Sequence, residues 1–138
     1  MGDQTNKSVL VLDEALPLGL MLNTAAVLGI TLGRKVEDIL GPDAVDGSGQ
    51  VHTALTRVTV PILKGSAAIL AAIRERAATA TGLIVADVSA PAQQSRSAEE
   101  YLEKVARVPA HELTYLGVAL YGEARQVARL TGSLPLLR

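Results

Sequence analysis

Four short apolar runs, separated by segments with helical spacing, constrain the fold of this chain most strongly. The runs lie at residues 8–12 (SVLVL), 57–63 (RVTVPIL), 83–88 (LIVADV) and 114–121 (TYLGVALY). Runs of this length and composition favour β-strands. Strands that alternate with amphipathic helices predict a sheet enclosed by helical layers. Because 138 residues is the length of one ordinary domain, we expect residues 1–138 to form a single α/β domain.

Local features place two of these strands within the sheet. Residues 8–12 form a continuous apolar run with acidic residues soon after it, which is typical of a central strand buried on both faces. Pro61 has no backbone N–H to donate to a neighbouring strand, so the run 57–63 is expected at an edge. Between these two runs, Asp46-Gly47 and Gly49 predict a tight turn or a small hairpin.

The segment after the first strand is expected to be helical from Pro17 to Gly33. It contains no charged residue between positions 15 and 33, but prolines and glycines interrupt it and no aromatic residues flank it. We therefore expect a buried core helix rather than a membrane span. A second short helix, ended by Gly41-Pro42, is expected because three apolar residues have helical spacing: Val36, Ile39 and Leu40.

Serine caps predict two further helices. Ser66 is expected to cap residues 67–78, with Ile69, Leu70 and Ile73 inward and Arg74, Glu75 and Arg76 outward. Ser97 and Glu100 have the spacing of a capping box. The inward face of that helix is expected to hold Tyr101, Leu102 and Val105. A last helix is expected over residues 123–131, stopped by Gly132.

Composition excludes several classes of function. The net charge of −1 and the scattered basic residues disfavour nucleic acid as a partner. With three tyrosines and no Phe or Trp, a base-stacking surface would also be thin. The absence of cysteine excludes disulfides, thiolate zinc sites and cysteine nucleophiles. The opening residues MGDQTNKS do not have the pattern of a signal peptide, so we expect a cytoplasmic protein.

No metal or cofactor is expected from the motifs. His52 lies near Asp43 and Asp46, but the spacing fits no calcium loop and a turn explains both aspartates. His111-Glu112 begins like a zinc-protease motif, yet Tyr115 stands in the place of the second histidine. Phosphate-binding and dinucleotide-binding glycine motifs are also absent from the sequence.

Polar residues at the ends of strands are the candidate binding residues. Asp13 and Asp87 each end or follow an apolar run, and ligands of open α/β sheets favour the crevice beyond the carboxyl ends of strands. If the two strands lie close together, the carboxylates can share a proton or a divalent cation. The alternative is that each aspartate caps a turn.

Three amides extend this candidate crevice. Asn23 lies within the apolar helix, where its amide needs a partner, either a neighbouring loop or a ligand. Gln93 and Gln94, followed by Ser95 and Arg96, supply hydrogen-bond donors in a loop after the third strand. The alternative for this loop is an ordinary solvated connection.

Four stretches of the sequence resemble one known family. They read LDEALPLGLMLNTAAVLG, DGSGQVH, TYLGVALYG and LTGSLPLL, and together they span nearly the whole chain. They resemble the bacterial family of domains of unknown function numbered two thousand, which is similar in fold to type-two peptidyl-tRNA hydrolases. The resemblance implies a three-layer α/β/α fold with a four-stranded mixed sheet. It also implies that residues 134–137 lie as an extended segment against the domain, and Leu136 and Leu137 can cover apolar surface there.

The resemblance also implies positions for active-site residues. Asp87 is similar to an acidic residue of those hydrolases, and Thr114 to a hydroxyl residue. Their lysine, in the turn after the first strand, has no counterpart, because Gly19 or Leu20 falls near its place. Asn23 falls where those enzymes have a glutamine. Without the cation, negative charge that develops on an ester would stay unneutralised, which argues against peptidyl-tRNA hydrolysis.

Three hypotheses follow for the function. The first is a binding or regulatory domain with a small-molecule crevice at Asp13, Gly19, Asn23, Asp87, Gln93 and Gln94. The second is a hydrolase of an ester or amide, such as a peptidyl or aminoacyl adduct, that uses Asp87 and Thr114. The third is a structural homodimer formed through the face of the strand at 114–121 and the leucine-rich tail.

Overall fold

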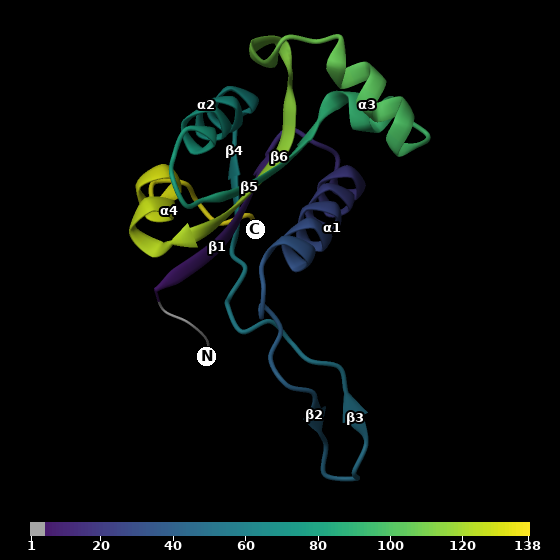
Figure 1. The fold of residues 1–138 in the computed structure, drawn as a ribbon, viewed down its shortest axis with the longest axis vertical. Coiled ribbons are helices and arrows are strands. Elements are labelled where there is room, and N and C mark those ends of the chain that lie inside the picture. The colour runs from purple at the N-terminus through teal and green to yellow at the C-terminus, as the bar shows by residue number, and fades with distance from the viewer. Residues whose placement is uncertain (1–4) are drawn as a thin grey trace.

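The computed structural model describes residues 5–138, and its core is a four-stranded mixed sheet of order β4-β1-β6-β5 (Figure 1). β1 (Asn6–Asp13) pairs in parallel with β4 (Ile62–Gly65) and antiparallel with β6 (Tyr115–Glu123). β6 pairs antiparallel with β5 (Ile84–Ser89). The expected central position of the first strand is confirmed. The second predicted strand is at an edge as expected, but it begins after Pro61, at Ile62, and residues 57–61 are not part of it. Residues 1–4, part of the opening segment without signal-peptide features, lie outside the described residues.

Helices cover both faces of the sheet, as the sequence predicts. α1 (Leu18–Lys35) packs on one face, and α2 (Ala67–Ala78) and α4 (Ala124–Thr131) pack on the other (Figure 1). The alternation of strand side chains divides the core between them. Val9 and Val11 of β1 belong to the cluster under α2 and α4, whereas Leu10 and Leu12 belong to the cluster under α1. Aliphatic side chains therefore form nearly all of both core layers.

β6 is not available as a dimer surface, which corrects the expectation for the strand at 114–121. It lies between β1 and β5, and residues 115–120 are buried. α1 contacts it from one face, and α2 and α4 from the other. The apolar side chains of this strand therefore serve the core of their own chain.

α1 is buried on one face only, so the expectation of a helix buried all round is wrong. Its buried residues are Thr24, Leu28 and Leu32. The opposite face is exposed to solvent although it is apolar, and the exposed fraction reaches 75% at Ile30. Within residues 5–138, no helix is both long and apolar enough to cross a membrane.

The second short helix expected around Val36 does not form, because its backbone pairs with a returning segment of the chain. The carbonyl of Ile39 accepts a hydrogen bond from the N–H of Arg57 at 2.7 Å. The N–H of Gly41 donates to the carbonyl of Leu55 at 2.8 Å. Val36 and Ile39 are buried all the same, so apolar residues at helical spacing here reflect contact with the core rather than a helix.

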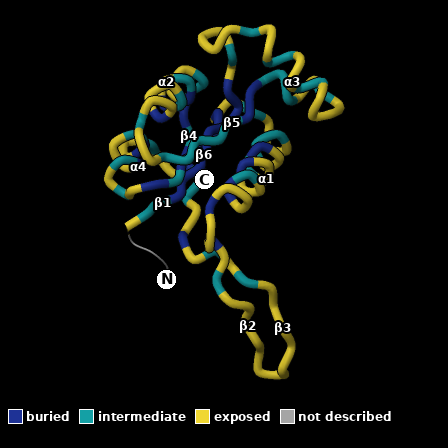
Figure 2. Tube along the Cα trace, viewed as in Figure 1, coloured by how far each residue is buried: buried dark blue, intermediate teal, exposed yellow. Residues whose placement is uncertain are grey.

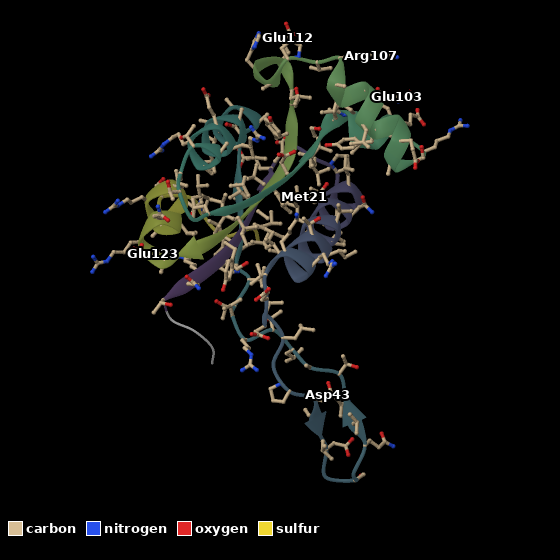
Figure 3. All side chains as sticks on the ribbon, in the orientation of Figure 1. Met21, Asp43, Glu103, Arg107, Glu112 and Glu123 are labelled. Carbon is tan, nitrogen blue, oxygen red and sulfur yellow. The ribbon has the colours of Figure 1, made fainter. Side chains whose placement is uncertain are left out.

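This pairing begins a long arm, residues 40–56, that leaves the body of the protein (Figures 1 and 3). The expected hairpin is confirmed: β2 (Ala44–Val45) pairs antiparallel with β3 (Val51–His52). The carboxylate of Asp46 accepts hydrogen bonds from the N–H groups of Ser48 and Gln50 in the turn. Its bond with His52 is the first of several that hold the pKa of Asp46 below its usual range.

Both serine caps are confirmed. Ser66 Oγ accepts a hydrogen bond from the N–H of Ile69, and Ser97 Oγ accepts one from Glu100 at the start of α3 (Ala98–Ala106). Leu102, expected to face inward, is instead 65% exposed. The reason is that α3 packs mainly against the short 3₁₀ helix η1 (Ala90–Gln94) rather than over a face of the sheet.

The leucine-rich tail lies against the domain, as expected. The N–H of Lys64 donates to the carbonyl of Pro135 at 3.0 Å, and the N–H of Leu137 donates to that of Ile62 at 2.9 Å. The tail therefore covers the free edge of β4. Gly132 ends α4, but its φ of −64° is helical. Glycine is required there for space, because a Cβ would lie 2.6 Å from the carbonyl oxygen of Ala128.

The contact between α1 and β6 buries a hydroxyl without a partner. Thr24 is 1% exposed, and its Oγ1 has no hydrogen-bond partner among the described residues. A buried polar group without a partner costs about 1–3 kcal/mol. We therefore expect Thr24→Val, which replaces the hydroxyl by a methyl group, to raise the free energy of unfolding in urea by about 1 kcal/mol.

Thr131 provides the matched control for this substitution. It is equally buried, but its Oγ1 donates to the carbonyl of Val127 at 2.8 Å. Thr131→Val removes a satisfied hydroxyl and is expected to give no gain in stability. An equal gain from both substitutions would contradict the proposed cause.

Candidate functional site

The two aspartates at the strand ends do not meet. β1 and β5 point in the same direction, but β6 lies between them, so their backbones are about 9–10 Å apart. Asp13 Oδ1 accepts a hydrogen bond from the N–H of Ala15 at 3.0 Å, which confirms the turn-capping alternative for this residue. Asp87 instead pairs with Arg74. The expectation that Asp13 and Asp87 share a proton or a cation is therefore wrong.

The other predicted site residues are dispersed. Gly19 and Asn23 are exposed on α1, and no partner of the Asn23 amide is found among the described residues. Gln93 and Gln94 are exposed at the end of η1, where the carbonyl of Gln94 accepts a hydrogen bond from the ammonium group of a lysine in α3. Thr114 is exposed just before β6, and its carbonyl accepts a bond from the residue after β5. Apart from Asp87, none of them lines the cleft described next.

That cleft, called the α3 cleft below, has a volume of about 520 Å³ and lies between α1, the edge strand β5, η1 and α3. Its walls include six residues from these elements: Val27, Thr31, Asp87, Val88, Arg96 and Tyr101. The sequence predicts that Asp87 and the segment that contains Arg96 belong to one candidate crevice. Both residues line this cleft, although the carboxylate of Asp87 pairs with Arg74 of α2.

The charge of Arg96 is not neutralised within the described part of the chain. Its backbone N–H donates to Glu100 Oε2 at 3.0 Å, and Lys104 Nζ lies 3.0 Å from Glu100 Oε1. The bond from Arg96 N–H and the bond to Lys104 hold the pKa of Glu100 below its usual range. Lys104 therefore balances the charge of Glu100. The Arg96 guanidinium has no hydrogen bond or ion pair among residues 5–138.

A pair of hydroxyl groups joins the helix to the sheet beside the cleft. Ser89 Oγ and Tyr101 Oη lie 3.1 Å apart, and Ser89 is 1% exposed. Either hydroxyl can donate in this pair. Ser89 was not identified from the sequence, because the 3₁₀ turn that follows it gives no local signal that its side chain points to α3.

Arg74 is the second functional group that sequence analysis missed. It was assigned to the outward face of its helix, but Arg74 Nε lies 3.3 Å from Asp87 Oδ2 and its guanidinium carbon lies 5.8 Å from the ring centre of Tyr115. Both side chains of the ion pair are partly shielded from solvent. A signal was present in the sequence: Arg74 is four residues after Leu70, which the spacing already predicts to face inward.

Arg74 also lines a second hollow, of about 560 Å³, between α2 and the short 3₁₀ helix η2 (Ala110–Glu112). We call it the α2 hollow. Tyr115 and the exposed His111 contribute to it. Burial raises the pKa of the Tyr115 phenol above its usual value, although the charge of Arg74 opposes this shift. Tyr115 therefore stays protonated at neutral pH.

Among the described residues, no group of three or more histidine or acidic side chains is placed to hold a metal ion. The polar groups at or beside the α3 cleft and the α2 hollow include two arginines, one carboxylate and three hydroxyl groups: Arg74, Arg96, Asp87, Ser89, Tyr101 and Tyr115.

Comparison with known proteins places the chain in a family. The model of the family described as "Protein of unknown function (DUF2000)" matches residues 6–138. This chain belongs to the DUF2000 family. The resemblance noted from four sequence stretches is thereby confirmed at the level of the family.

A solved structure is similar to this DUF2000 chain over its whole length. It is a protein of unknown function from Agrobacterium tumefaciens strain C58, with a TM-score of 0.90 and 17% sequence identity. The match covers 99% of the present chain and 100% of the other. At this identity the likeness shows the shared fold alone. A search of the curated proteins finds no match.

Proposed function

We propose that this DUF2000 member is a cytoplasmic binding or regulatory domain whose small ligand occupies the α3 cleft. The observation that carries the proposal is the guanidinium of Arg96, which has no partner among the described residues and lines a cleft together with Asp87. The cleft volume of about 520 Å³ is within the usual range for small-molecule sites. A free cation in a concave site is a suitable anchor for an anionic group.

The balance of charges supports an anionic ligand. Asp87 is neutralised by Arg74, and Glu100 by Lys104, so the charge that remains at the cleft is the positive charge of Arg96. The Tyr101 hydroxyl offers a hydrogen bond, and Val88 offers an apolar wall. The proposed ligand is therefore a small metabolite with a carboxylate or phosphate group and an apolar portion.

Thermal unfolding with a panel of small carboxylates and phosphates tests this proposal. A ligand at about 100 times its dissociation constant adds about 2.7 kcal/mol of stability, which raises the unfolding temperature of a domain of this size by roughly 10 °C. We expect Arg96→Gln to abolish this rise. Arg107→Gln, an exposed arginine at the end of α3 outside the cleft, is the matched control and is expected to keep it.

Two results would contradict the proposal that a ligand binds in the α3 cleft. One is a panel in which no compound stabilises the wild-type protein. The other is a compound that stabilises Arg96→Gln as strongly as it stabilises the wild type, since binding would then not depend on the cation of the cleft.

A second candidate is hydrolysis of an ester or amide, suggested by the similarity in fold expected between this family and type-two peptidyl-tRNA hydrolases. The observation in its favour is Arg74, a cation that lies beside Asp87 although the lysine of those enzymes has no counterpart. It is the weaker candidate, because the carboxylate of Asp87 is engaged in that ion pair and the Thr114 hydroxyl has no hydrogen bond to a catalytic base among the described residues. Release of peptide from purified peptidyl-tRNA decides it, and turnover no faster than in buffer excludes it.

A further inference from the structure

The exposed face of α1 is largely apolar. Its large exposed side chains are Leu18, Leu22, Val27 and Ile30, which are spread over the half of the helix that points away from the buried residues Thr24, Leu28 and Leu32. Leu18 is 71% exposed and Ile30 is 75% exposed. No charged residue interrupts positions 15–33. Isolated exposed leucines are ordinary, but a contiguous apolar surface on a folded domain marks an interaction site.

The arm, residues 40–56, presents a second set of exposed apolar side chains. Residues 42–53 are all exposed, and the chain provides no layer beneath them (Figure 2). The arm nevertheless carries four large apolar residues that water surrounds: Leu40, Val45, Val51 and Leu55. A two-stranded hairpin of this kind has little stability by itself in water. Its apolar residues therefore indicate that another surface packs against it.

We propose that both surfaces are covered by a second copy of this chain, with α1 packed against α1 and each arm lying on the partner. The arm follows directly after the carboxyl end of α1. In a two-fold pair with antiparallel α1 helices, the arm of each copy therefore starts beside the amino-terminal half of the other copy's α1. Such an interface uses the same patch on both copies and closes on itself.

The area of the two surfaces is sufficient for a stable dimer. Eight large apolar side chains, four on α1 and four on the arm, are exposed. At roughly 100 Å² each they supply on the order of 800 Å², which is the contribution of one partner to an interface of standard size. A membrane surface is a poorer occupant, because helices that lie on membranes carry basic residues along the polar face and α1 has none before Arg34.

The dimer also affects the α3 cleft. Val27 and Thr31 of α1 form one wall of that cleft. A second copy packed on α1 lies beside this wall and narrows the open side of the cleft. The dimer inference does not depend on the proposed ligand, since it rests on α1 and the arm alone.

Sedimentation equilibrium of the full chain tests this inference. The wild type is expected to have twice the mass of one chain at micromolar concentration. Ile30→Glu on α1 and Leu55→Glu on the arm are each expected to reduce the mass to that of one chain, because each places a charge in the apolar interface. Both positions are exposed in the single chain, at 75% and 77%, so circular dichroism should show unchanged secondary structure.

Leu102→Glu is the matched control, because Leu102 is a similarly exposed apolar residue on α3, outside both surfaces. It is expected to remain a dimer. The inference is overturned if the wild type is a monomer at hundreds of micromolar, or if Ile30→Glu and Leu55→Glu both leave the mass doubled. It is also overturned if the wild type is a monomer that co-sediments with lipid vesicles.

Discussion

Deletion of residues 134–138 is expected to lower the free energy of unfolding by about 4–6 kcal/mol. The deletion removes two backbone hydrogen bonds between the tail and β4, each worth about 1 kcal/mol. It also removes Leu134 and Leu137, which pack against the two core clusters, at about 1–2 kcal/mol each for partly buried side chains. Urea denaturation of the full and shortened chains measures the difference.

A control separates the tail's packing from the mere loss of residues. Removal of Arg138 alone takes away an exposed residue and is expected to change stability by less than about 0.5 kcal/mol. If the chain that lacks residues 134–138 unfolds at the same urea concentration as the full chain, the tail does not stabilise the edge of the sheet.

Gly117→Val is expected to lower the free energy of unfolding by about 3 kcal/mol. Gly117 lies in β6 beneath α1, and a Cβ there would lie 2.7 Å from Thr24 Cγ2 and 2.9 Å from Leu28 Cδ1. The helix packs closely against the strand only because this residue has no side chain. Gly117→Ala should show a smaller loss in the same direction, since it adds one carbon instead of three.

The comparison for Gly117→Val is the same substitution at a glycine with open space around it. A Cβ at Gly33, near the end of α1, would meet no atom within 4 Å. Gly33→Val is therefore expected to cost nothing measurable, and the lower helix preference of glycine favours a small gain. A loss of similar size at both positions would show that β-branching, rather than the contact with α1, causes the effect of Gly117→Val.

The features of the fold that local chemistry determines could be predicted from the sequence. Pro61 cannot donate to a neighbouring strand, and the strand that follows it is at the edge of the sheet. Ser66 and Ser97 cap their helices because each hydroxyl needs only an N–H three residues away. Such interactions lie within one segment, so their partners are visible in the sequence itself.

The features that depend on distant segments could not be predicted. The run at 36–40 has helical spacing, but a returning strand supplies its hydrogen bonds through Arg57. Likewise, Leu102 is exposed because α3 lies beside the edge of the sheet rather than on its face. Spacing shows which residues share a side, and only the arrangement of elements shows whether anything covers that side.

The candidate site likewise contains some residues that could be predicted from the sequence and others that could not. Asp87 and the segment with Arg96 could be assigned to one crevice because Asp87 lies near the carboxyl end of the strand that this segment follows. Asp13 could not be excluded, because the last strand of the chain, β6, inserts between β1 and β5. Arg74 reaches Asp87 from a different helix, and the charge of that carboxylate therefore depends on a contact that the sequence does not reveal.

The position of the ligand tests the central claim most directly. The most stabilising compound of the carboxylate and phosphate panel should be titrated into ¹⁵N-labelled protein while the backbone amide resonances are followed. Binding in the α3 cleft predicts that the largest shifts fall within residues 87–101, together with Val27 and Thr31 of α1. Shifts that cluster instead around Arg74 and His111 of the α2 hollow, or a spectrum that does not change, would contradict the claim.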